Sequence, residues 1–437
     1  MSGSSPRRRS RASGLGSRGF PPAPLPRNVA ARLARYRELL ANRSFFSFLV
    51  SLALGEAGYA VYALGILWLA LSVSGSAFIT GIVLAVEFGV YALSFLVGPL
   101  VDRARDLRTI LLIGYPVQGV FAAALGVLAI YDRLTVPLLL VLIVGLSVTW
   151  DFTWTALNAV PPRIVTTDRL FLANGLAGAA SGGNQIAGYA GGAALLLLVG
   201  SPGSAMLLYA ALNVAAAVCI LPLRAPSPPR APARFVDEMR DGWRYLLRTR
   251  DPPVISLVAF SGLEAFFSAA APLLIAILTY RSFADPSRAY ALLFSAFAIG
   301  GIAGSFTLGE LSPRRRIATT LIFASAAEGI LLLLAIEASP SLLWSFPAWI
   351  AVGFVDVAFY EVVLVFLQAT TPAPLLGRTV ANAYLFRGGS RALGALALGA
   401  LLVFVAPGVV GLLLAAVFLA VAFVVPAAVP SIRRLEF

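Results

Sequence analysis

The residues of this chain that could do chemistry are acidic groups that interrupt long apolar runs. They are Glu56, Glu87, Asp151, Glu264, Glu328, Asp356 and Glu361. An ionisable side chain at membrane depth is costly to bury, so such residues mark pathways for protons, ions or polar solutes. Burial also favours the uncharged form of a carboxylic acid, which allows protons to be bound and released near neutral pH. The pattern therefore predicts proton binding rather than bond making or breaking.

Two arginines interrupt a later apolar run and complement these acids. Arg387 and Arg391 are four residues apart, a spacing that places them on one face of a helix. Asp356 lies at the depth of Arg391, and Glu361 lies at about the depth of Arg387, although the five-residue spacing of the two acids does not align both pairs. One interpretation is a structural network between helices. The other is that the arginines bind an anionic group of a substrate or control the proton affinity of the carboxylates.

Groups for covalent or metal chemistry are scarce. The chain has no His and a single Cys219 inside an apolar run, so an imidazole proton shuttle, a disulfide within the chain and a thiolate metal site are excluded. No Gly-x-Ser-x-Gly motif or phosphate-binding loop is found. We therefore expect no catalytic residue, no metal site and no cofactor. A membrane-embedded enzyme and a channel stay open as rivals of other classes.

The elements that must position these residues are membrane-spanning helices. Of the 437 residues, 59% are hydrophobic and 12% charged, whereas roughly a quarter are charged in soluble domains. A bilayer core about 30 Å thick needs roughly 20 apolar residues per helix. The predicted fold class is an all-α integral membrane protein with 12 transmembrane helices in two six-helix pseudo-symmetric bundles. The spans are expected near residues 45–72, 78–101, 109–131, 136–160, 170–199, 203–223, 253–280, 287–311, 316–337, 342–370, 379–404 and 407–428.

The distribution of positive charge predicts the orientation of the chain. All 33 basic residues are Arg, and the net charge is +13. With both termini cytoplasmic, nearly all Arg residues fall in cytoplasmic segments, as positive charge does during insertion. The exceptions are Arg133, Arg281 and Arg288 on the other side, and Arg387 and Arg391 within a span. The charge therefore indicates topology in a cell membrane, plasma or inner, and not binding of nucleic acid.

Composition shifts divide the chain into five parts. Residues 1–44 are expected to be a basic, disordered cytoplasmic tail, which includes a possible interfacial helix from Asn28 to Arg43. Residues 45–223 and 253–430 are the two bundles. Residues 224–252 form a cytoplasmic linker, in which apolar residues recur at helical spacing and predict an amphipathic helix. Residues 431–437 are a second cytoplasmic tail.

The two halves of the chain resemble each other. Trp150-Asp151 followed by Leu157-Asn158-Ala159 matches Tyr360-Glu361 followed by Leu367-Gln368-Ala369. Glu56-Ala57 matches Glu264-Ala265, and the segment 181–185 matches 387–391. Each pair falls six spans apart, which indicates duplication. Parallel six-helix repeats are typical of secondary transporters, in which two bundles rock about a site near the midplane.

A loop motif and several shorter ones carry a family resemblance over roughly residues 45–430. Gly98-Pro-Leu-Val-Asp102-Arg103, followed by Arg105 and Arg108, resembles the loop between the second and third helices of the major facilitator superfamily. Further motifs resemble its prokaryotic drug and siderophore exporter branch, which includes the enterobactin exporter and macrolide efflux proteins. These motifs are Gly55-Glu56, Ser74-Gly75-Ser76, Asp151, Pro162-Arg163, Ala173-Asn174, the linker segment 239–246, and Gly377-Arg378.

The resemblance implies a transporter that works by alternating access, an ion-coupled, proton-driven exporter of a small drug- or siderophore-like molecule. The alternative is an importer or a facilitator. We expect a monomer whose partners are the substrate, a proton and the lipid bilayer. Spans four and ten line the cavity in this family, so Asp151 and Glu361 are the first coupling candidates, and Glu56 and Glu264 follow. The remaining candidates are Asp356, Arg387 and Arg391 for transport and coupling, and Gly98, Asp102, Arg103, Arg105 and Arg108 for a cytoplasmic gate.

Overall fold

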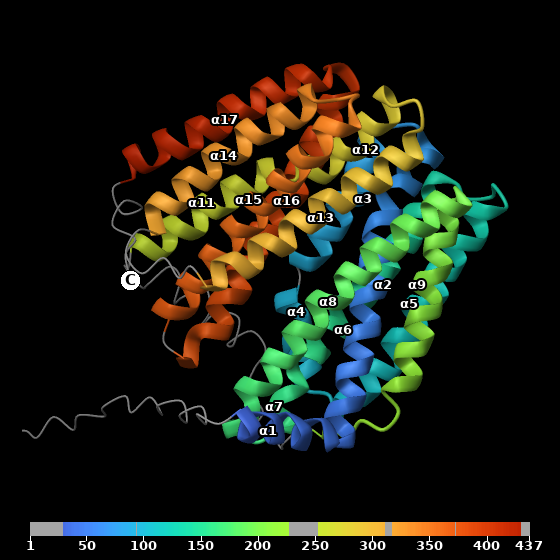
Figure 1. Ribbon diagram of the computed structural model, residues 1–437, viewed down its shortest axis with the longest axis vertical. Helices are drawn as coiled ribbons and strands as arrows, with labels where there is room; N and C mark the ends of the chain where they lie inside the picture. The colour runs from blue at the N-terminus through green and yellow to red at the C-terminus, as the bar shows by residue number, and fades with distance from the viewer. Residues whose placement is uncertain (1–28, 93, 227–251, 311–316, 372, 430–437) are drawn as a thin grey trace, which may run out of the picture.

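The computed structural model describes residues 29–92, 94–226, 252–310, 317–371 and 373–429, which are almost entirely helical (Figure 1). The predicted tail up to residue 28, the predicted amphipathic helix of the linker, the segment 311–316 and residues 430–437 lie outside this part of the chain. The labels of Figure 1 are used below.

Helices from the first half of the chain pack into one bundle. It contains α2 (Arg43–Ser74), α3 (Ala77–Ala92), α4 (Ser94–Asp102), α5 (Leu107–Ile130), α6 (Val136–Ala159), α7 (Pro161–Ile164), α8 (Thr167–Val199) and α9 (Pro202–Cys219), with α1 (Val29–Ala41) at its edge. Within it α2 packs on α8 and α9, and α5 packs on α6 and α9.

Helices from the second half form the other bundle. It contains α11 (Pro252–Ser268), α12 (Ala270–Ser282), α13 (Pro286–Glu310), α14 (Ile317–Glu337), α15 (Leu342–Thr370), α16 (Ala373–Phe404) and α17 (Pro407–Ala428). Here α13 and α14 pack on α15, α14 packs on α17, and α11 packs on α16. The sequence order and the packing therefore separate the chain into two groups of helices.

Local signals in the sequence set where several helices begin and end. The side chain of Asn42 accepts hydrogen bonds from the backbone N–H of Ser44 at 3.0 Å and of Phe45 at 3.3 Å, which caps the start of α2. Asp106 caps α5 by accepting from the backbone N–H of Arg108 at 3.0 Å. Gly75 ends α2 at φ 61°, a left-handed conformation that glycine adopts without a steric penalty.

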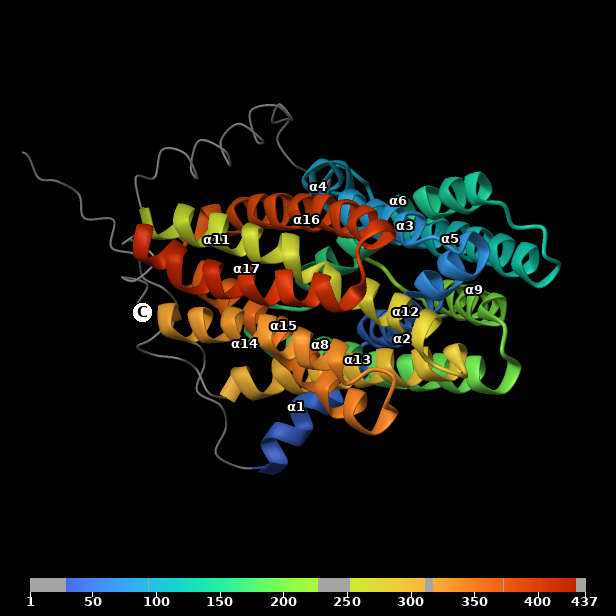
Figure 2. The ribbon, with the colours of Figure 1, turned by 90° about the horizontal axis from the view of Figure 1, so that it is seen from above.

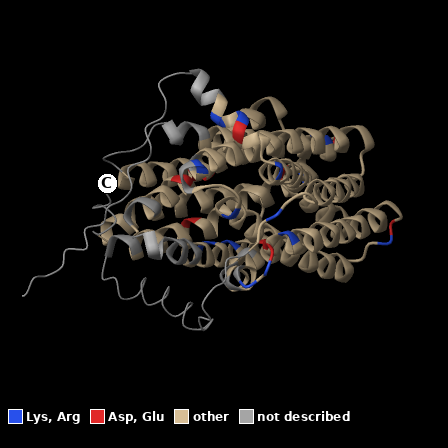
Figure 3. Ribbon diagram, turned by 90° about the horizontal axis from the view of Figure 1, so that it is seen from below, with Lys and Arg blue, Asp and Glu red and all other residues tan. Residues whose placement is uncertain are grey.

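The helices are long and apolar enough to account for the predicted spans. Among the described residues, ten helices or continuous helix pairs are long and apolar enough to cross a membrane, and the pair α11–α12 counts as one of them. The remaining spans are α3 with α4, between which residue 93 lies outside the described residues, and α8, whose 33 residues include a polar middle. The predicted fold class of twelve transmembrane helices is therefore confirmed. Charged residues occupy few positions on this ribbon (Figure 3).

The two bundles meet near one face of the molecule. We call this face the turn face, because it carries the short turns at Gly75, Asp132 and Gly200; the opposite face, which carries α1 and α7, is the α1 face. Near the turn face α3 lies against α16, and α8 lies against α13 (Figure 2). A Cβ on Gly81 would lie only 2.6 Å from the carbonyl oxygen of Ala395, so glycine permits this close approach.

The bundles diverge toward the α1 face (Figure 1). At the turn face, by contrast, the hydroxyl of Tyr290 donates a hydrogen bond of 2.7 Å to the carbonyl oxygen of Leu64 in the other bundle. Its ring stacks on that of Trp68, with 5.1 Å between centroids. The contact between the bundles is therefore concentrated at one end of the helices.

The predicted interfacial helix corresponds to α1. Leu39 is 2% exposed, so this helix is anchored on the first bundle. Glu38 accepts an ion pair of 2.8 Å from Arg169 at the start of α8, and the amide of Asn42 donates to the carbonyl oxygen of Ile164 at 3.4 Å. These contacts tie α1 to the ends of α7 and α8 on the α1 face.

Candidate functional site

A cavity of about 310 Å³ lies where the two bundles meet. Both bundles contribute to its wall, which makes it a site whose shape depends on how the bundles sit against each other. The first bundle provides α2, α3, α6 and α8, and the second provides α15 and α16. The bordering residues are Glu56, Tyr59, Tyr62, Glu87, Phe88, Leu146, Ser147, Trp150, Trp154, Gln185, Tyr360, Tyr384, Arg387, Gly388 and Arg391.

Stacked aromatic rings form part of the wall from the first bundle. The rings of Trp150 and Trp154, one helical turn apart on α6, lie with centroids 5.6 Å apart and an angle of 7° between their planes. The ring of Tyr59 on α2 stacks on Trp150 at 4.9 Å. Such a surface offers a flat, apolar contact for a ring or a lipophilic group.

Two carboxylates lie on the same wall. Glu56 on α2 is 5% exposed and accepts a hydrogen bond of 2.7 Å from the amide of Gln185 on α8. Glu87 on α3 also borders the cavity, and its Oε1 is buried without a hydrogen-bond partner in the described structure. Among the described bordering residues, the first bundle contributes no basic one. The wall from the first bundle therefore combines aromatic rings with carboxyl groups.

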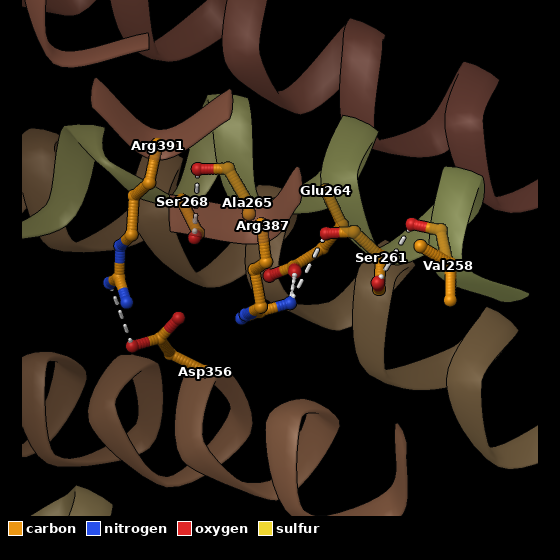
Figure 4. Close-up of polar contacts among 8 residues, drawn as sticks. All are labelled: Val258, Ser261, Glu264, Ala265, Ser268, Asp356, Arg387 and Arg391. Atoms are coloured by element: carbon orange, nitrogen blue, oxygen red, sulfur yellow. Dashed lines mark hydrogen bonds and ion pairs between the residues drawn. The ribbon is translucent and has the colours of Figure 1, made fainter. Parts of the chain in front are cut away.

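The opposite wall carries two arginines that are held by carboxylates of their own bundle (Figure 4). Arg387 on α16 donates from Nη1 to Oε2 of Glu264 on α11 at 2.6 Å, and to the carbonyl oxygen of Ser261 at 3.2 Å. Arg391, one turn further along α16, donates to Oδ2 of Asp356 on α15 at 3.4 Å. Such charge-assisted contacts are strong and orient the guanidinium groups.

Aromatic rings also contact both arginines. The guanidinium carbon of Arg387 lies 5.2 Å from the ring centroid of Tyr360, and the hydroxyl of Tyr360 donates to that of Tyr384 at 2.7 Å. Arg391 lies 4.8 Å from the ring centroid of Phe88 on α3. Since Phe88 belongs to the first bundle, this cation–π contact crosses between the two walls.

The structure bears on the two ion pairs that the sequence allows. The pair Asp356–Arg391 is present, which confirms that prediction. The pair Glu361–Arg387 is not among the ion pairs of the described residues, and Arg387 contacts Glu264 instead. The reason is geometric: five residues rotate a helix by about 140° from the starting direction. Asp356 and Glu361 therefore cannot both face α16.

The two first coupling candidates lie beside the cavity rather than on its wall. Asp151 on α6 is 1% exposed, next to Trp150 in the sequence. Glu361 on α15 is half-buried and follows Tyr360. Neither is among the residues that border the cavity in the described structure. Their roles in coupling stay predictions.

Glu328 was not among the predicted transport and coupling residues, yet the structure places it among these charges. Glu328 on α14 is 0% exposed. One carboxylate oxygen from each of Glu264, Glu328 and Asp356 lies within 4.8 Å of the others. The sequence shows that Glu328 lies inside an apolar run. It does not show which face of α14 turns toward α11 and α15.

The predicted gate residues lie on the α1 face, at the junction of α4 and α5. Arg103 and Arg105 are exposed, whereas Nε of Arg108 is buried without a hydrogen-bond partner in the described structure. The backbone N–H of Leu107 donates to the carbonyl oxygen of Ala225 at 3.3 Å, so this loop contacts the start of the linker after α9. The side chain of Asp102 is outside the described residues, and the gate role stays a prediction.

Comparison with solved structures shows the same fold in transporters of low sequence identity. A POT family transporter in complex with 5-aminolevulinic acid superposes with a TM-score of 0.72 at 10% identity, covering 90% of this chain and 97% of that one. The nucleoside transporter NupG gives 0.70 at 13% identity, with 88% and 98% covered. A bacterial homologue of the lysosomal transporter Spinster, in an inward-facing and unoccupied conformation, gives 0.64 at 14% identity, with 90% and 96% covered.

The family model is more direct evidence than the fold. A search of the curated proteins finds no relative that matches the chain. The model of the Major Facilitator Superfamily, by contrast, matches residues 45–395, which include nearly all of the helices around the cavity. Two bundles, a cavity between them and this match together indicate a multi-pass membrane transporter rather than an enzyme. The chain belongs to the Major Facilitator Superfamily.

Proposed function

We propose that this protein is a proton-coupled secondary transporter that exports a small organic molecule from the cytoplasm by alternating access. The observation that carries the proposal is the cavity itself, which combines an acidic, aromatic wall from one bundle with an arginine-bearing wall from the other. Rocking of the bundles would separate or join these walls and so change the affinity for a ligand between them. The functional unit in this proposal is the monomer.

The orientation follows from the distribution of arginine. Arg103, Arg105 and Arg169 lie at the α1 face, so we assign this face to the cytoplasm, with both termini on that side. The bundles are packed together at the turn face and diverge toward the α1 face. The state described here is then inward-facing. The loop with Gly98, Asp102, Arg103, Arg105 and Arg108 would close the cytoplasmic side when the bundles rock.

The charges of the cavity favour a substrate with a positive group and a flat, apolar part. Glu56 and Glu87 face the cavity from a wall without a basic residue among those described. The arginines of the other wall are already held by Glu264 and Asp356, so they attract an anion less than free guanidinium groups would. The stacked rings of Tyr59, Trp150 and Trp154 supply the apolar surface. A lipophilic organic cation fits these features.

Proton coupling is assigned to carboxylates on and beside the cavity. Glu56 belongs to the first bundle, and Glu264 and Asp356 belong to the second, where Arg387 and Arg391 connect them to the cavity wall. Asp151 and Glu361 lie within one residue of cavity-bordering aromatic residues and complete the set. A proton and a cationic substrate would compete for Glu56, because one carboxylate cannot hold both positive charges. Binding of one would release the other, which would link proton entry to substrate export.

A growth screen tests the proposed substrate class. The chain is expressed in a bacterium that lacks its own efflux pumps and is challenged with toxic lipophilic cations, neutral compounds and anions. We expect protection against some cations that is lost in Glu56→Gln and retained in Glu337→Gln, an exposed acid at the end of α14. Protection against anions alone would overturn the substrate class.

Direction is tested separately, because an importer or a facilitator is the alternative. A cation from the screen is offered to inverted membrane vesicles with an imposed pH gradient that is acidic inside. We expect accumulation that collapses when the gradient is dissipated. Uptake that stops at equal concentrations with or without the gradient would identify a facilitator, and accumulation only in right-side-out vesicles would identify an importer.

A further inference from the structure

We propose that Glu264 and Glu328 share one bound proton in a closed cluster behind the arginine wall of the cavity. The cluster consists of Glu264 on α11, Glu328 on α14 and Asp356 on α15, with Arg387 and Arg391 on α16. Glu328 stands on α14, which does not contribute to the cavity wall. The inference therefore adds a proton-holding residue outside the cavity to the proposed coupling.

Charge is the first argument. Three carboxylates and two guanidinium groups leave a net charge of −1 if every acid is ionised. Glu264 and Glu328 are 0% exposed, so water cannot screen this charge. On the described helices that pack on α14, no further positive charge lies beside the cluster: α17 contains no charged residue, α12 contains only Arg281 at its far end, and α15 adds only a second acid, Glu361. One bound proton makes the cluster neutral.

Hydrogen bonding is the second and independent argument. Both side-chain oxygens of Glu328 and Oε1 of Glu264 are buried and receive no hydrogen bond in the described structure. Two ionised carboxylates in contact would leave these oxygens unsatisfied and repelling each other. A proton on either residue turns the contact between Glu328 and Glu264 into a hydrogen bond, which satisfies an oxygen on each side.

A proton fits this cluster better than a metal ion does. The three carboxylate oxygens lie close enough to ligate a cation. A divalent ion would, however, raise the net charge to +1 and would sit beside guanidinium groups that already occupy Oε2 of Glu264 and Oδ2 of Asp356. Hard cations also take about six or more oxygen ligands. A proton needs only the two facing oxygens.

The shared proton is connected to the cavity through Arg387. This guanidinium group borders the cavity and binds Glu264 at 2.6 Å. When the proton leaves, the pair Glu264–Glu328 gains a negative charge and holds Arg387 more tightly. When it returns, Arg387 is freer to move toward a ligand. Glu328 is thus a positioning residue that acts through Glu264 and Arg387, and this consequence rests on the proposed transport function.

Infrared spectroscopy of the purified chain tests the shared proton without any substrate. A protonated carboxyl group has a C=O band that a carboxylate lacks. We expect the wild type to show such a band and Glu328→Gln to lose it. Glu264→Gln should lose the same band, because two carboxylates and two arginines then balance. The double variant should lose no more than either single variant. Glu337→Gln, on the exposed end of α14, should lose nothing.

The pattern of lost bands distinguishes one shared proton from two independent protons. Loss of two distinct bands, one for each residue, would mean two independent protons and would overturn the sharing. Retention of the band in Glu328→Gln would also overturn it. Gel filtration and thermal unfolding show which variants are folded, and Glu264→Gln carries the test alone if Glu328→Gln is not. Because no transport is measured, failure of the proposed substrate or direction leaves this result intact.

Discussion

The two bundles hold a buried glutamate with different kinds of partner. In the first, Glu56 on α2 accepts a hydrogen bond from a neutral amide, that of Gln185 on α8. In the second, the repeat-equivalent Glu264 on α11 binds a charged guanidinium group, that of Arg387 on α16. Both contacts join the first and fifth spans of their bundle. A contact between these two spans is thus present in both bundles, but the residue that aligns with Arg387 is Ser181, and the partner is neutral in the first bundle and charged in the second.

Other buried polar contacts show the same difference between the bundles. In the first bundle the amide of Gln118 donates to the hydroxyl of Thr153 at 2.7 Å, and the hydroxyl of Tyr209 donates to Gln118 at 2.8 Å. This network is neutral. In the second bundle the cluster around Glu264 consists of charged groups. The first bundle therefore satisfies these buried groups with neutral partners, whereas the second pairs its acids with arginines.

The largest expected loss of stability comes from removing Arg387 from the second bundle. Arg387→Gln leaves Glu264 buried beside Glu328 without its guanidinium partner, and breaking a buried pair costs about 3–5 kcal/mol of folding free energy. The loss should shrink at acidic pH, because added protons replace the missing positive charge. Thermal unfolding in detergent across a pH series measures this. Equal loss at every pH would contradict the charge argument.

Removal of the glutamate's partner in the first bundle should cost less folding free energy. Gln185→Leu removes the amide that donates to Glu56, and an unsatisfied buried acceptor costs about 1–3 kcal/mol. Glu56 is 5% exposed and borders the cavity, so water can replace part of the bond. The same unfolding assay, with Arg387→Gln in parallel, measures the difference. A loss as large as that of Arg387→Gln would break the comparison between the bundles.

Binding should depend on the aromatic wall of the first bundle. Trp150→Leu removes the ring that stacks on both Tyr59 and Trp154, and a loss of about 1.4 kcal/mol corresponds to tenfold weaker binding. Titration of a transported cation into the purified protein gives the dissociation constant. Trp344→Leu, an exposed tryptophan on α15, is the matched control. Equal weakening in both variants would argue against an aromatic contact with the substrate.

The smallest effect is expected where the bundles touch at the turn face. Tyr290→Phe removes the hydrogen bond to Leu64 but keeps the ring on Trp68, and a net loss of about 1 kcal/mol would shift the populations of the two states about fivefold. Spin labels at positions 133 and 285, in a Cys219→Ala background, report the distance between the bundles at this face. An unchanged distance distribution would mean that this bond does not hold the face closed.

Much of the fold was predictable because its signals are local in the chain. Apolar runs such as 342–370 and 407–428 correspond closely to α15 and α17, since a bilayer core demands a fixed length of apolar helix. The helix predicted from Asn28 to Arg43 appears as α1 because its amphipathic spacing is likewise a local property. The split between α11 and α12 was not predicted, because packing of neighbouring helices compensates such an interruption.

The residues of the site were predictable from the sequence, but their contacts with one another were not. The sequence by itself determined that acids and arginines lie inside apolar runs, that the halves repeat, and that Asp356 and Arg391 share a depth. Only the tertiary structure decided that Arg387 pairs with Glu264, that Glu328 joins them, and that Asp151 lies behind the cavity wall. The physical reason is that composition sets the depth of a side chain in the membrane, whereas its partner depends on how each helix is rotated about its axis, and that rotation is set by packing against all neighbouring helices.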